Sequence, residues 1–288
     1  MVLPGIDARA ETLTVATYNL ENYLSTDRLT GSGYRKDYPK PEDEKRALRS
    51  VVRALNADVL ALQEMGPRAY LEEFRRDLKA EGIDYPHAVL LEAADADRHV
   101  ALLSKRPLKG VVLHTDLEFA YFEKKETVKR GLLEASVATG GGDITLFVVH
   151  LKSRFTDRPD DPLSVARRSA EATAVRDRVL RRFTDPSAAR FLIVGDCNDG
   201  KPSKTLQHLA RRGKTTVAEL LPAADSRGEN WTHSYRKEES YSRVDHVLVS
   251  PGLQPAVEGG AARIYDGPGV REASDHRPVI VTLQTGKR

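Results

Sequence analysis

Phe-Leu-Ile-Val-Gly-Asp-Cys-Asn, residues 191–198, is the stretch of the sequence that decides the fold class. An apolar run rich in β-forming residues is followed by a glycine and then by Asp196 and Asn198. This order is typical of a buried strand that ends in polar side chains beside a cleft. Alternation along the strand directs Cys197 away from its two polar neighbours, so we assign it a packing role.

Seven further short runs have the same strand character, which gives eight strands and suggests more than one sheet. The glycine-rich segment 140–143 separates two of these runs and predicts a β-hairpin. The seven runs cover residues 13–18, 59–62, 100–104, 132–137, 144–149, 244–249 and 278–283.

Amphipathic segments lie between the strands and predict three helices. The first covers 41–56, with Pro41 in its first turn, and the second covers 70–80. The third covers 163–183, and the spacing of its small and apolar residues predicts that its arginines face outward. Helices that alternate with strands, some of them in antiparallel pairs, predict an α/β fold.

The composition is that of a globular protein, since the 288 residues are 40% hydrophobic and 30% charged, with a net charge of +3. No repeat or linker separates two folding units, so residues 1–288 are expected to form a single domain. The longest apolar runs are far shorter than the roughly 20 residues of a membrane span. No signal peptide is evident, so we favour a cytoplasmic location, and secretion stays open if a signal was trimmed. For the oligomeric state we favour a monomer.

Cys197 is the only cysteine, which excludes an intramolecular disulfide and a thiolate metal cage. Any metal must therefore bind through oxygen or imidazole ligands. Two segments are basic: 163–183 holds six arginines and two acidic residues, and 201–216 holds five basic residues and no acidic one. They are as compatible with solvated faces as with attraction of phosphate.

Polar residues of similar chemistry stand at the ends of several predicted strands. Each alone is more typical of a turn or a helix cap. Together they combine carboxylates, carboxamides and imidazoles without a thiolate or a serine nucleophile, which favours hard-cation chemistry on phosphate. The set consists of Asn19, Glu64, His150, Asp196, Asn198, Asp245, Asp275 and His276.

Oxygen ligands in this set favour Mg²⁺ or Mn²⁺ as the cofactor. Glu64 and Asp275, with the carboxamide of Asn19, suit these ions, which prefer oxygen and keep several waters. Zinc fits these ligands less well.

Six motifs occur in the order and strand contexts of one known superfamily. The chain resembles the endonuclease/exonuclease/phosphatase superfamily, with a deoxyribonuclease-I-like fold, over about residues 14–282. The resemblance implies a four-layer α/β/β/α sandwich of two mixed, largely antiparallel sheets. The motifs are Thr-Tyr-Asn (17–19), Leu-Gln-Glu (62–64), His-Leu-Lys-Ser (150–153), Gly-Asp-Cys-Asn (195–198), Arg-Val-Asp-His (243–246) and Ser-Asp-His-Arg-Pro (274–278).

The resemblance also implies how the metal and the attacking water are held. Glu64 would be the main metal ligand, Asn19 would lie beside the metal, and Asp275 would complete the ionic end of the site. Asp196 would activate or orient the attacking water. These roles follow from the matched motifs and not from spacing.

On the phosphate side, the resemblance implies that Asn198 holds both the scissile phosphate and the water-activating carboxylate. His150 and His276 would donate hydrogen bonds to phosphate oxygens or to the leaving group. Asp245 would orient His276, because a carboxylate on one ring nitrogen fixes the tautomer and aims the other N–H.

Several further residues are weaker candidates. Arg130, Lys152 and Arg154 could bind substrate phosphates, although cations on exposed loops are more often only solvated. Glu21 stands where some nucleases of the superfamily have an aspartate, so its metal role stays open, and Asn22 is another candidate.

The sequence thus predicts a metal-dependent phosphodiesterase, in the first instance a nuclease with DNA or RNA as its partner. Basic residues suffice for backbone contact, and an aromatic content of 6% does not indicate sequence-specific reading of bases. A phosphomonoesterase or lipid phosphodiesterase of the inositol phosphate or sphingomyelin type could use the same site. In that case Trp231 and Tyr235 could line a substrate pocket, although packing in the core or in a loop explains them equally well. A binding module without catalysis is disfavoured, because each matched position holds a competent residue.

Overall fold

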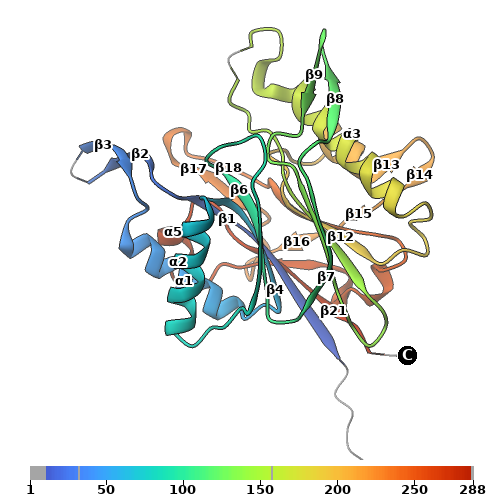
Figure 1. Cartoon of the computed structure of the whole chain (residues 1–288), viewed down its shortest axis with the longest axis horizontal. Helices are drawn as coiled ribbons and strands as arrows, with labels where there is room; N and C mark the ends of the chain where they lie inside the picture. Colours follow the sequence, from blue (N-terminus) through green and yellow to red (C-terminus); the bar gives the residue numbers. More distant parts are fainter. Residues whose placement is uncertain (1–10, 32, 157, 287–288) are drawn as a thin grey trace, which may run out of the picture.

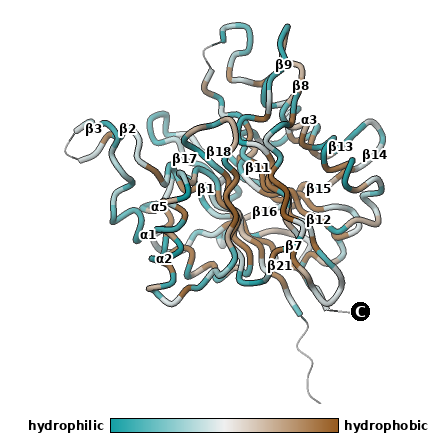
Figure 2. Tube along the Cα trace, in the orientation of Figure 1, coloured by the Kyte–Doolittle hydropathy of each residue, from teal (hydrophilic) through white to brown (hydrophobic). Residues whose placement is uncertain are grey.

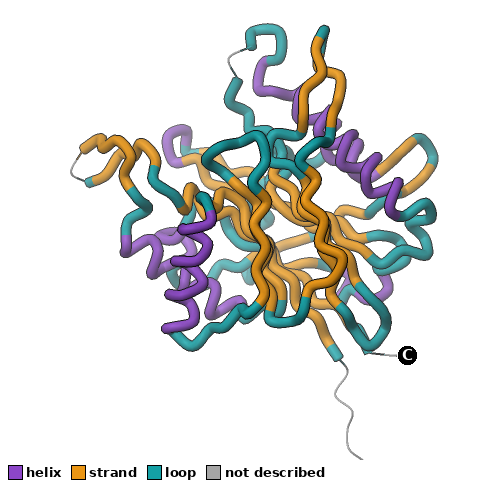
Figure 3. The backbone as a smooth tube through the Cα atoms, viewed as in Figure 1, coloured by secondary structure: helices purple, strands orange, loops and turns teal. Residues whose placement is uncertain are grey.

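Two large β-sheets form the centre of the protein in a computed structural model that describes residues 11–31, 33–156 and 158–286. The two sheets face each other, and the helices lie outside them (Figure 1, Figure 3). The predicted four-layer α/β/β/α sandwich is confirmed.

The first sheet has the strand order β16-β20-β21-β1-β4-β6-β5. It contains parallel and antiparallel pairs: β1 is parallel to β4 and antiparallel to β21. Its strands are β1 (Thr12–Tyr23), β4 (Val59–Met65), β5 (His87–Leu91), β6 (His99–Ser104), β16 (Ala223–Ala224), β20 (Ala262–Ile264) and β21 (Val279–Gln284).

The second sheet has the order β15-β19-β12-β11-β10-β7. Its central pair, β11 and β12, is parallel, and the neighbours β10 and β19 run antiparallel to that pair. Its strands are β7 (Leu108–His114), β10 (Leu132–Val137), β11 (Ile144–His150), β12 (Phe191–Asp196), β15 (Glu219–Leu220) and β19 (Asp245–Val249).

Small two-stranded hairpins and five α-helices complete the described part of the chain. The hairpins are β2 (Thr26–Thr30) with β3 (Gly33–Tyr38), β8 (Glu118–Tyr121) with β9 (Lys124–Thr127), β13 (Arg211–Arg212) with β14 (Thr215–Thr216), and β17 (His233–Tyr235) with β18 (Ser240–Ser242). The helices are α1 (Glu42–Leu55), α2 (Arg68–Ala80), α3 (Val165–Arg182), α4 (Lys204–Ala210) and α5 (Val270–Ala273), with 3-10 turns at Pro162–Ser164, Arg236–Glu238, Gln254–Ala256 and Glu258–Gly260.

Hydrophobic residues fill the space between the sheets and the space under the helices. Val15 and Leu102 of the first sheet share the inner core with Leu146 and Leu192 of the second. Alternation along each strand sends the intervening residues to the outer faces, where the helices cover them. Figure 2 shows the hydrophobic residues concentrated along the central strands.

All eight predicted strands and all three predicted helices are present, with boundaries within a few residues. The segment 140–143 joins β10 to the antiparallel β11 as predicted. The sequence analysis missed the sheet strands β5, β7, β15, β16 and β20, the small hairpins, and the helices α4 and α5. No helix among the described residues is long and apolar enough to span a membrane.

The prediction that the α3 arginines face outward is wrong for Arg168. Its side chain is almost fully buried, with only 1% of the residue exposed, and it donates hydrogen bonds to the carbonyls of Lys152 and Leu163. The buried face follows Ala172, Val175 and Val179, so the small residues at 166, 170 and 174 lie away from its centre. A buried arginine is tolerated here because backbone carbonyls and a carboxylate satisfy its guanidinium.

Candidate active site

The polar residues that follow the central strands meet at one end of the two sheets. Asn19 lies on β1 of the first sheet and Asp196 at the end of β12 in the second. The amide Nδ2 of Asn19 donates to Oδ2 of Asp196 at 3.0 Å, so the two sheets are joined at this point. His150 and Asp196 are register partners on parallel strands, which places both at the same sheet edge.

Asp196 lies at the centre of this end of the molecule and is buried. Its Oδ1 accepts a hydrogen bond from the backbone N–H of Asn198 at 2.7 Å, and its Oδ2 accepts one from Nδ2 of the same residue at 3.2 Å. Burial and the nearby charge of Asp245 raise the pKa of Asp196 to about 7. A carboxyl group with a pKa near neutrality suits proton exchange with water.

The backbone around Asp196 explains why its motif contains glycine and asparagine. Gly195 has φ +141°, and a Cβ there would lie 2.0 Å from the carbonyl oxygen of Val149 on the neighbouring strand. Only glycine fits this close approach. Asn198 has φ +52°, a left-handed conformation that asparagine tolerates, and its Nδ2 also donates to the carbonyl of Leu151 at 3.0 Å. The carboxamide of Asn198 is therefore held in one orientation.

Asp245 and His276 form a buried pair at the neighbouring position. Oδ2 of Asp245 lies 2.8 Å from Nδ1 of His276, and the backbone N–H of Asp245 donates to Oγ1 of Thr232 at 3.0 Å. Burial lowers the pKa of His276, but the charge and hydrogen bond of Asp245 outweigh it and raise the pKa well above its usual value. This pKa direction favours the protonated ring, in which Nε2 is the remaining donor. Asp245 and Asp196 are also register partners.

The pKa of His150 is shifted in the opposite direction to that of His276. Its Nε2 lies 3.7 Å from Oδ2 of Asp196 and 3.9 Å from Oε1 of Glu64. Burial, reinforced by the positive charge of Arg130, lowers the pKa of His150 well below the usual range. The pKa values of His150 and His276 are thus shifted in opposite directions, because a carboxylate lies in hydrogen-bond contact with His276 and not with His150.

Carboxylates gather at the more exposed side of the site. Oε2 of Glu64 accepts a hydrogen bond from the backbone N–H of Asn22 at 2.9 Å, and 19% of the Glu64 side chain is exposed. Glu21 accepts one from the backbone N–H of Asp275 at 2.9 Å. Burial and the charge of Asp275 raise the pKa of Glu21. Two crowded acids of this kind are stabilised by a cation.

The predicted metal ligands Asn19, Glu64 and Asp275 stand at the polar end of the two sheets, and their shared metal role stays a prediction. Among the described residues, two groups of acidic and imidazole side chains have ligand atoms within 4.8 Å of one another, and Glu64 belongs to neither. Asp275 belongs to one of them. Oδ1 of Asn19 accepts a hydrogen bond from the backbone of Glu21 at 3.0 Å. The groups are His233, Asp275 and His276, and Asp196, Asp245 and His276.

The donor chemistry nevertheless fits a hard divalent ion. Glu64 and Asp275 offer partly exposed carboxylate oxygens, and Glu21 lies beside Asp275, with Nζ of Lys40 3.9 Å from Oε2 of Glu21. Oxygen donors of this kind fit Mg²⁺ or Mn²⁺. The metal role of each named residue stays a prediction.

The weaker phosphate-binding candidates lie in different surroundings. Arg130 is buried, and its Nε lies 2.8 Å from Oδ2 of Asp95 in an ion pair, but neither Nε nor Nη1 has a hydrogen-bond partner. Nζ of Lys152 donates to the backbone carbonyl of Phe155, and burial lowers the pKa of Lys152 to about 8. Arg154 is exposed. Their roles toward substrate stay predictions.

His233 belongs to the site and was missed in the sequence. Its Nε2 lies 3.5 Å from Oδ2 of Asp275, and its ring centre lies 4.6 Å from that of His276. It stands on the short strand β17, which has no apolar pattern to mark it. Its only signal was its place between Trp231 and Tyr235, two residues considered for a substrate pocket.

Glu21 and Asn22, whose metal roles the sequence leaves open, also lie in this region of the site. Buried Lys40 donates from Nζ to the backbone carbonyl of Glu21 at 3.1 Å and lies 3.0 Å from Oε2 of Glu44. Asn22 accepts a hydrogen bond from Nε of Arg98 at 2.7 Å. Glu21 and Asn22 both have positive φ, so the chain bends sharply after the first motif.

A sequence model of the endonuclease/exonuclease/phosphatase family matches residues 16–276. The chain belongs to this family. It is accordingly a metal-dependent phosphoester hydrolase, as the motifs and the clustered acid and base groups indicate. No curated protein matches the sequence.

Solved structures share the fold at low sequence identity. A beta toxin variant from Staphylococcus aureus with bound magnesium ions is 17% identical, with a TM-score of 0.66 over 96% of this chain and 100% of that one. TDP2 from Caenorhabditis elegans is 16% identical, with a TM-score of 0.63 over 97% and 100%. Sphingomyelinase C from Streptomyces griseocarneus is 20% identical, with a TM-score of 0.59 over 95% and 99%.

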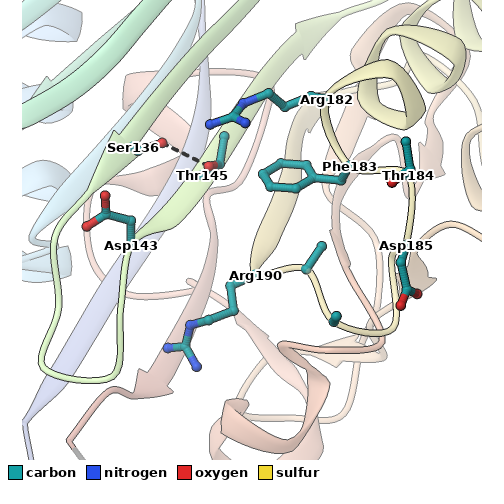
Figure 4. Close-up of a pocket in the computed structure, with 10 residues that line it drawn as sticks. Ser136, Asp143, Thr145, Arg182, Phe183, Thr184, Asp185 and Arg190 are labelled. Atoms are coloured by element: carbon teal, nitrogen blue, oxygen red, sulfur yellow. Dashed lines mark hydrogen bonds between the residues drawn. The ribbon is translucent and has the colours of Figure 1, made fainter.

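A separate pocket of about 440 Å³ lies at the other end of the second sheet (Figure 4). Thr145, at the start of β11, lines it together with Phe183 and Arg190. The strand runs from this pocket to His150, so the pocket lies away from the acid and base groups. It takes no part in the chemistry considered below.

The contact between Asp245 and His276 predicts that this enzyme loses turnover when the Asp245 carboxylate is removed. Asp245→Asn removes the charge that keeps His276 protonated, so we expect kcat to fall about 100-fold while KM changes little. Steady-state kinetics on a phosphodiester checks this. Asp160→Asn, at an exposed surface position, is the matched control and should change neither constant. A steep rise in KM at constant kcat would refute the orienting role.

The raised pKa of Asp196 predicts loss of activity in acid. A water-activating carboxylate must be ionised, so kcat/KM should fall as the pH drops below about 7. His276 stays protonated across this range because its pKa is raised. A pH–rate profile with a phosphodiester substrate measures this limb. A profile that stays flat down to about pH 5 would show that Asp196 does not titrate in the active enzyme.

Proposed function

We propose that the protein is a nuclease that hydrolyses phosphodiester bonds of DNA or RNA with the help of a divalent metal. The observation that carries this proposal is the cluster of Asp196, Asp245 and His276, whose possible ligand atoms lie within 4.8 Å of one another. It joins a carboxyl group with a raised pKa to a protonated imidazole. A base and an acid side by side are what water attack on a phosphodiester requires.

In the proposed reaction, Asp196 accepts the proton of the attacking water. Asn19 and Asn198 hold its carboxylate in place through their amide groups. His276 donates from Nε2 to a phosphate oxygen or to the leaving oxygen, and Asp245 holds its other nitrogen. Neutral His150 supplies a further hydrogen bond near the same carboxylate.

A divalent ion, Mg²⁺ or Mn²⁺, would be held by Glu64, with Asp275 and Asn19 as the other proposed ligands. When bound, it would neutralise charge that develops on the phosphate. Glu21 would lie beside it, and a cation there would relieve the repulsion between Glu21 and Asp275.

The distribution of basic residues supports a polyanionic substrate only in part. The arginines of α3 are largely paired within the protein; for example, Arg178 and Arg182 contact Glu134. The segment 201–216 begins three residues after Asn198 and carries exposed Lys201. Its five basic residues make no ion pair within the described part of the chain, so they support backbone contact beside the site.

A lipid phosphodiesterase is the second candidate, for one specific reason. Leu29 is 85% exposed and faces Tyr34, which is 62% exposed, on the β2–β3 hairpin. An exposed apolar pair on a projecting hairpin (Figure 1) suits contact with a lipid surface. The same catalytic groups would serve such a substrate, so the assay must include one.

Hydrolysis assays test the proposal. We expect cleavage of single- or double-stranded DNA or of RNA with Mg²⁺ or Mn²⁺, and loss of cleavage when a chelator removes the metal. Asp196→Asn and His276→Ala should each lower the rate at least about 100-fold, whereas Asp160→Asn should not.

The same substrate panel includes p-nitrophenyl phosphate, an inositol phosphate and sphingomyelin vesicles. Cleavage of a monoester alone would replace the nuclease proposal with a phosphatase. Cleavage of sphingomyelin alone would favour the lipid phosphodiesterase. Cleavage that survives both substitutions would refute the proposed acid and base.

A further inference from the structure

An aromatic pocket lies directly beside the proposed acid and metal residues. Its volume is about 210 Å³, and the hairpin β17–β18 forms much of its wall. Trp231, Tyr235 and Tyr241 line it together with Arg236 and Arg271. The three rings come from the hairpin and the residues just before it, and their surface stays accessible, whereas Arg271 comes from α5, a segment distant in the sequence.

Backbone contacts tie this pocket to the catalytic end of the molecule. The N–H of Ser234, a lining residue, donates to the carbonyl of Asp275 at 2.9 Å. His233, its neighbour, pairs with His276 across the same backbone bridge. A substrate group in the pocket would therefore lie next to a phosphate held at His276.

Contacts within the protein hold the wall of the pocket in place. Buried Arg277, which follows His276, donates from Nε to the carbonyl of Trp231 at 3.0 Å and from Nη1 to Asp225 at 2.7 Å. Its guanidinium carbon lies 3.4 Å from the centre of the Trp231 ring. Tyr241 contacts the same indole, with ring centres 4.8 Å apart. The indole is thus held in place by a residue of the catalytic motif.

The chemistry of the lining selects among possible ligands. Aromatic rings and guanidinium planes both stack on flat, electron-rich rings. Two arginines and a single acidic residue, Glu239, make the lining net positive. That charge disfavours a quaternary ammonium group such as choline and suits the base and flanking phosphate of a nucleotide.

We propose that this pocket, formed by Trp231, Tyr235, Tyr241, Arg236 and Arg271, binds an unpaired nucleobase adjacent to the scissile phosphate. This inference rests on the proposed nuclease function and narrows its substrate to single-stranded, frayed or flipped nucleotides. Stacking requires no particular base, so the pocket confers a preference for unpaired strands without sequence specificity.

The chain contains a single tryptophan, so intrinsic tryptophan fluorescence reports on this pocket alone. Metal-free wild-type protein is titrated with 5′-AMP, with ribose 5-phosphate as the matched ligand that lacks a base, and with phosphocholine. Excitation is set outside the adenine absorption band. We expect saturable quenching of Trp231 by 5′-AMP at concentrations at which the other two ligands have little effect.

Matched variants assign the signal to the rings. Tyr241 is 61% exposed, so Tyr241→Ala can be made without disturbing a core, and it should weaken the binding of 5′-AMP at least about fivefold. Tyr34→Ala removes a similarly exposed tyrosine on another hairpin and should leave the binding unchanged. Circular dichroism confirms that both variants fold.

Three results would overturn the inference: no quenching by 5′-AMP, equal quenching by ribose 5-phosphate or phosphocholine, or unchanged affinity in Tyr241→Ala. Metal-dependent hydrolysis of bis-p-nitrophenyl phosphate is measured on the same preparation. Hydrolysis without base binding would refute the pocket alone. Base binding without hydrolysis would refute the proposed function and leave a nucleotide-binding site.

Discussion

The hydrogen bond between Asn19 and Asp196, 3.0 Å long and buried, is the contact on which the site depends. It joins Asn19 of β1 to Asp196, the last residue of β12, and the two strands belong to different sheets. It can form only if the inner faces of both sheets pack closely, and the shared apolar core between them provides that packing. The catalytic residues are thus assembled by the sandwich as a whole rather than by one loop.

Burial then sets the proton chemistry. Asp196 and Asp245 face each other across adjacent strands, and two close carboxylates cannot both ionise easily. The contact with His276 offsets the charge of Asp245, whereas Asp196 has a pKa of about 7. His150 lies in the same enclosure without such a partner and stays neutral. The opposite pKa shifts of the two histidines therefore follow from which of them touches a carboxylate.

Much of this could be predicted from the sequence, because apolar strand runs followed by polar residues are visible without a structure. The strands that end at Asn19, His150 and Asp196 were found in this way, and the resemblance supplied the order of the motifs. His233 could not be found, because its strand is three residues long and its position depends on a backbone bridge to His276.

Buried polar residues were the other source of error. Arg168 and Lys40 look like solvated surface cations in sequence, since nothing local marks their partners. Arg168 is satisfied by carbonyls of a distant loop, and Lys40 by the bend at Glu21. The metal set Asn19, Glu64 and Asp275 stays a prediction, because it depends on how the side chains point and not only on which strand carries them.

The proposed proton chemistry depends on Asp245 keeping His276 protonated beside Asp196, and NMR titration of the imidazole measures this. The signal is assigned among the eight histidines by its loss in His276→Gln. The account predicts that His276 titrates well above its usual pKa of 6.5 in the wild-type protein and returns toward that value, or below it, in Asp245→Asn. A pKa near 6.5 that is the same in both proteins would contradict it.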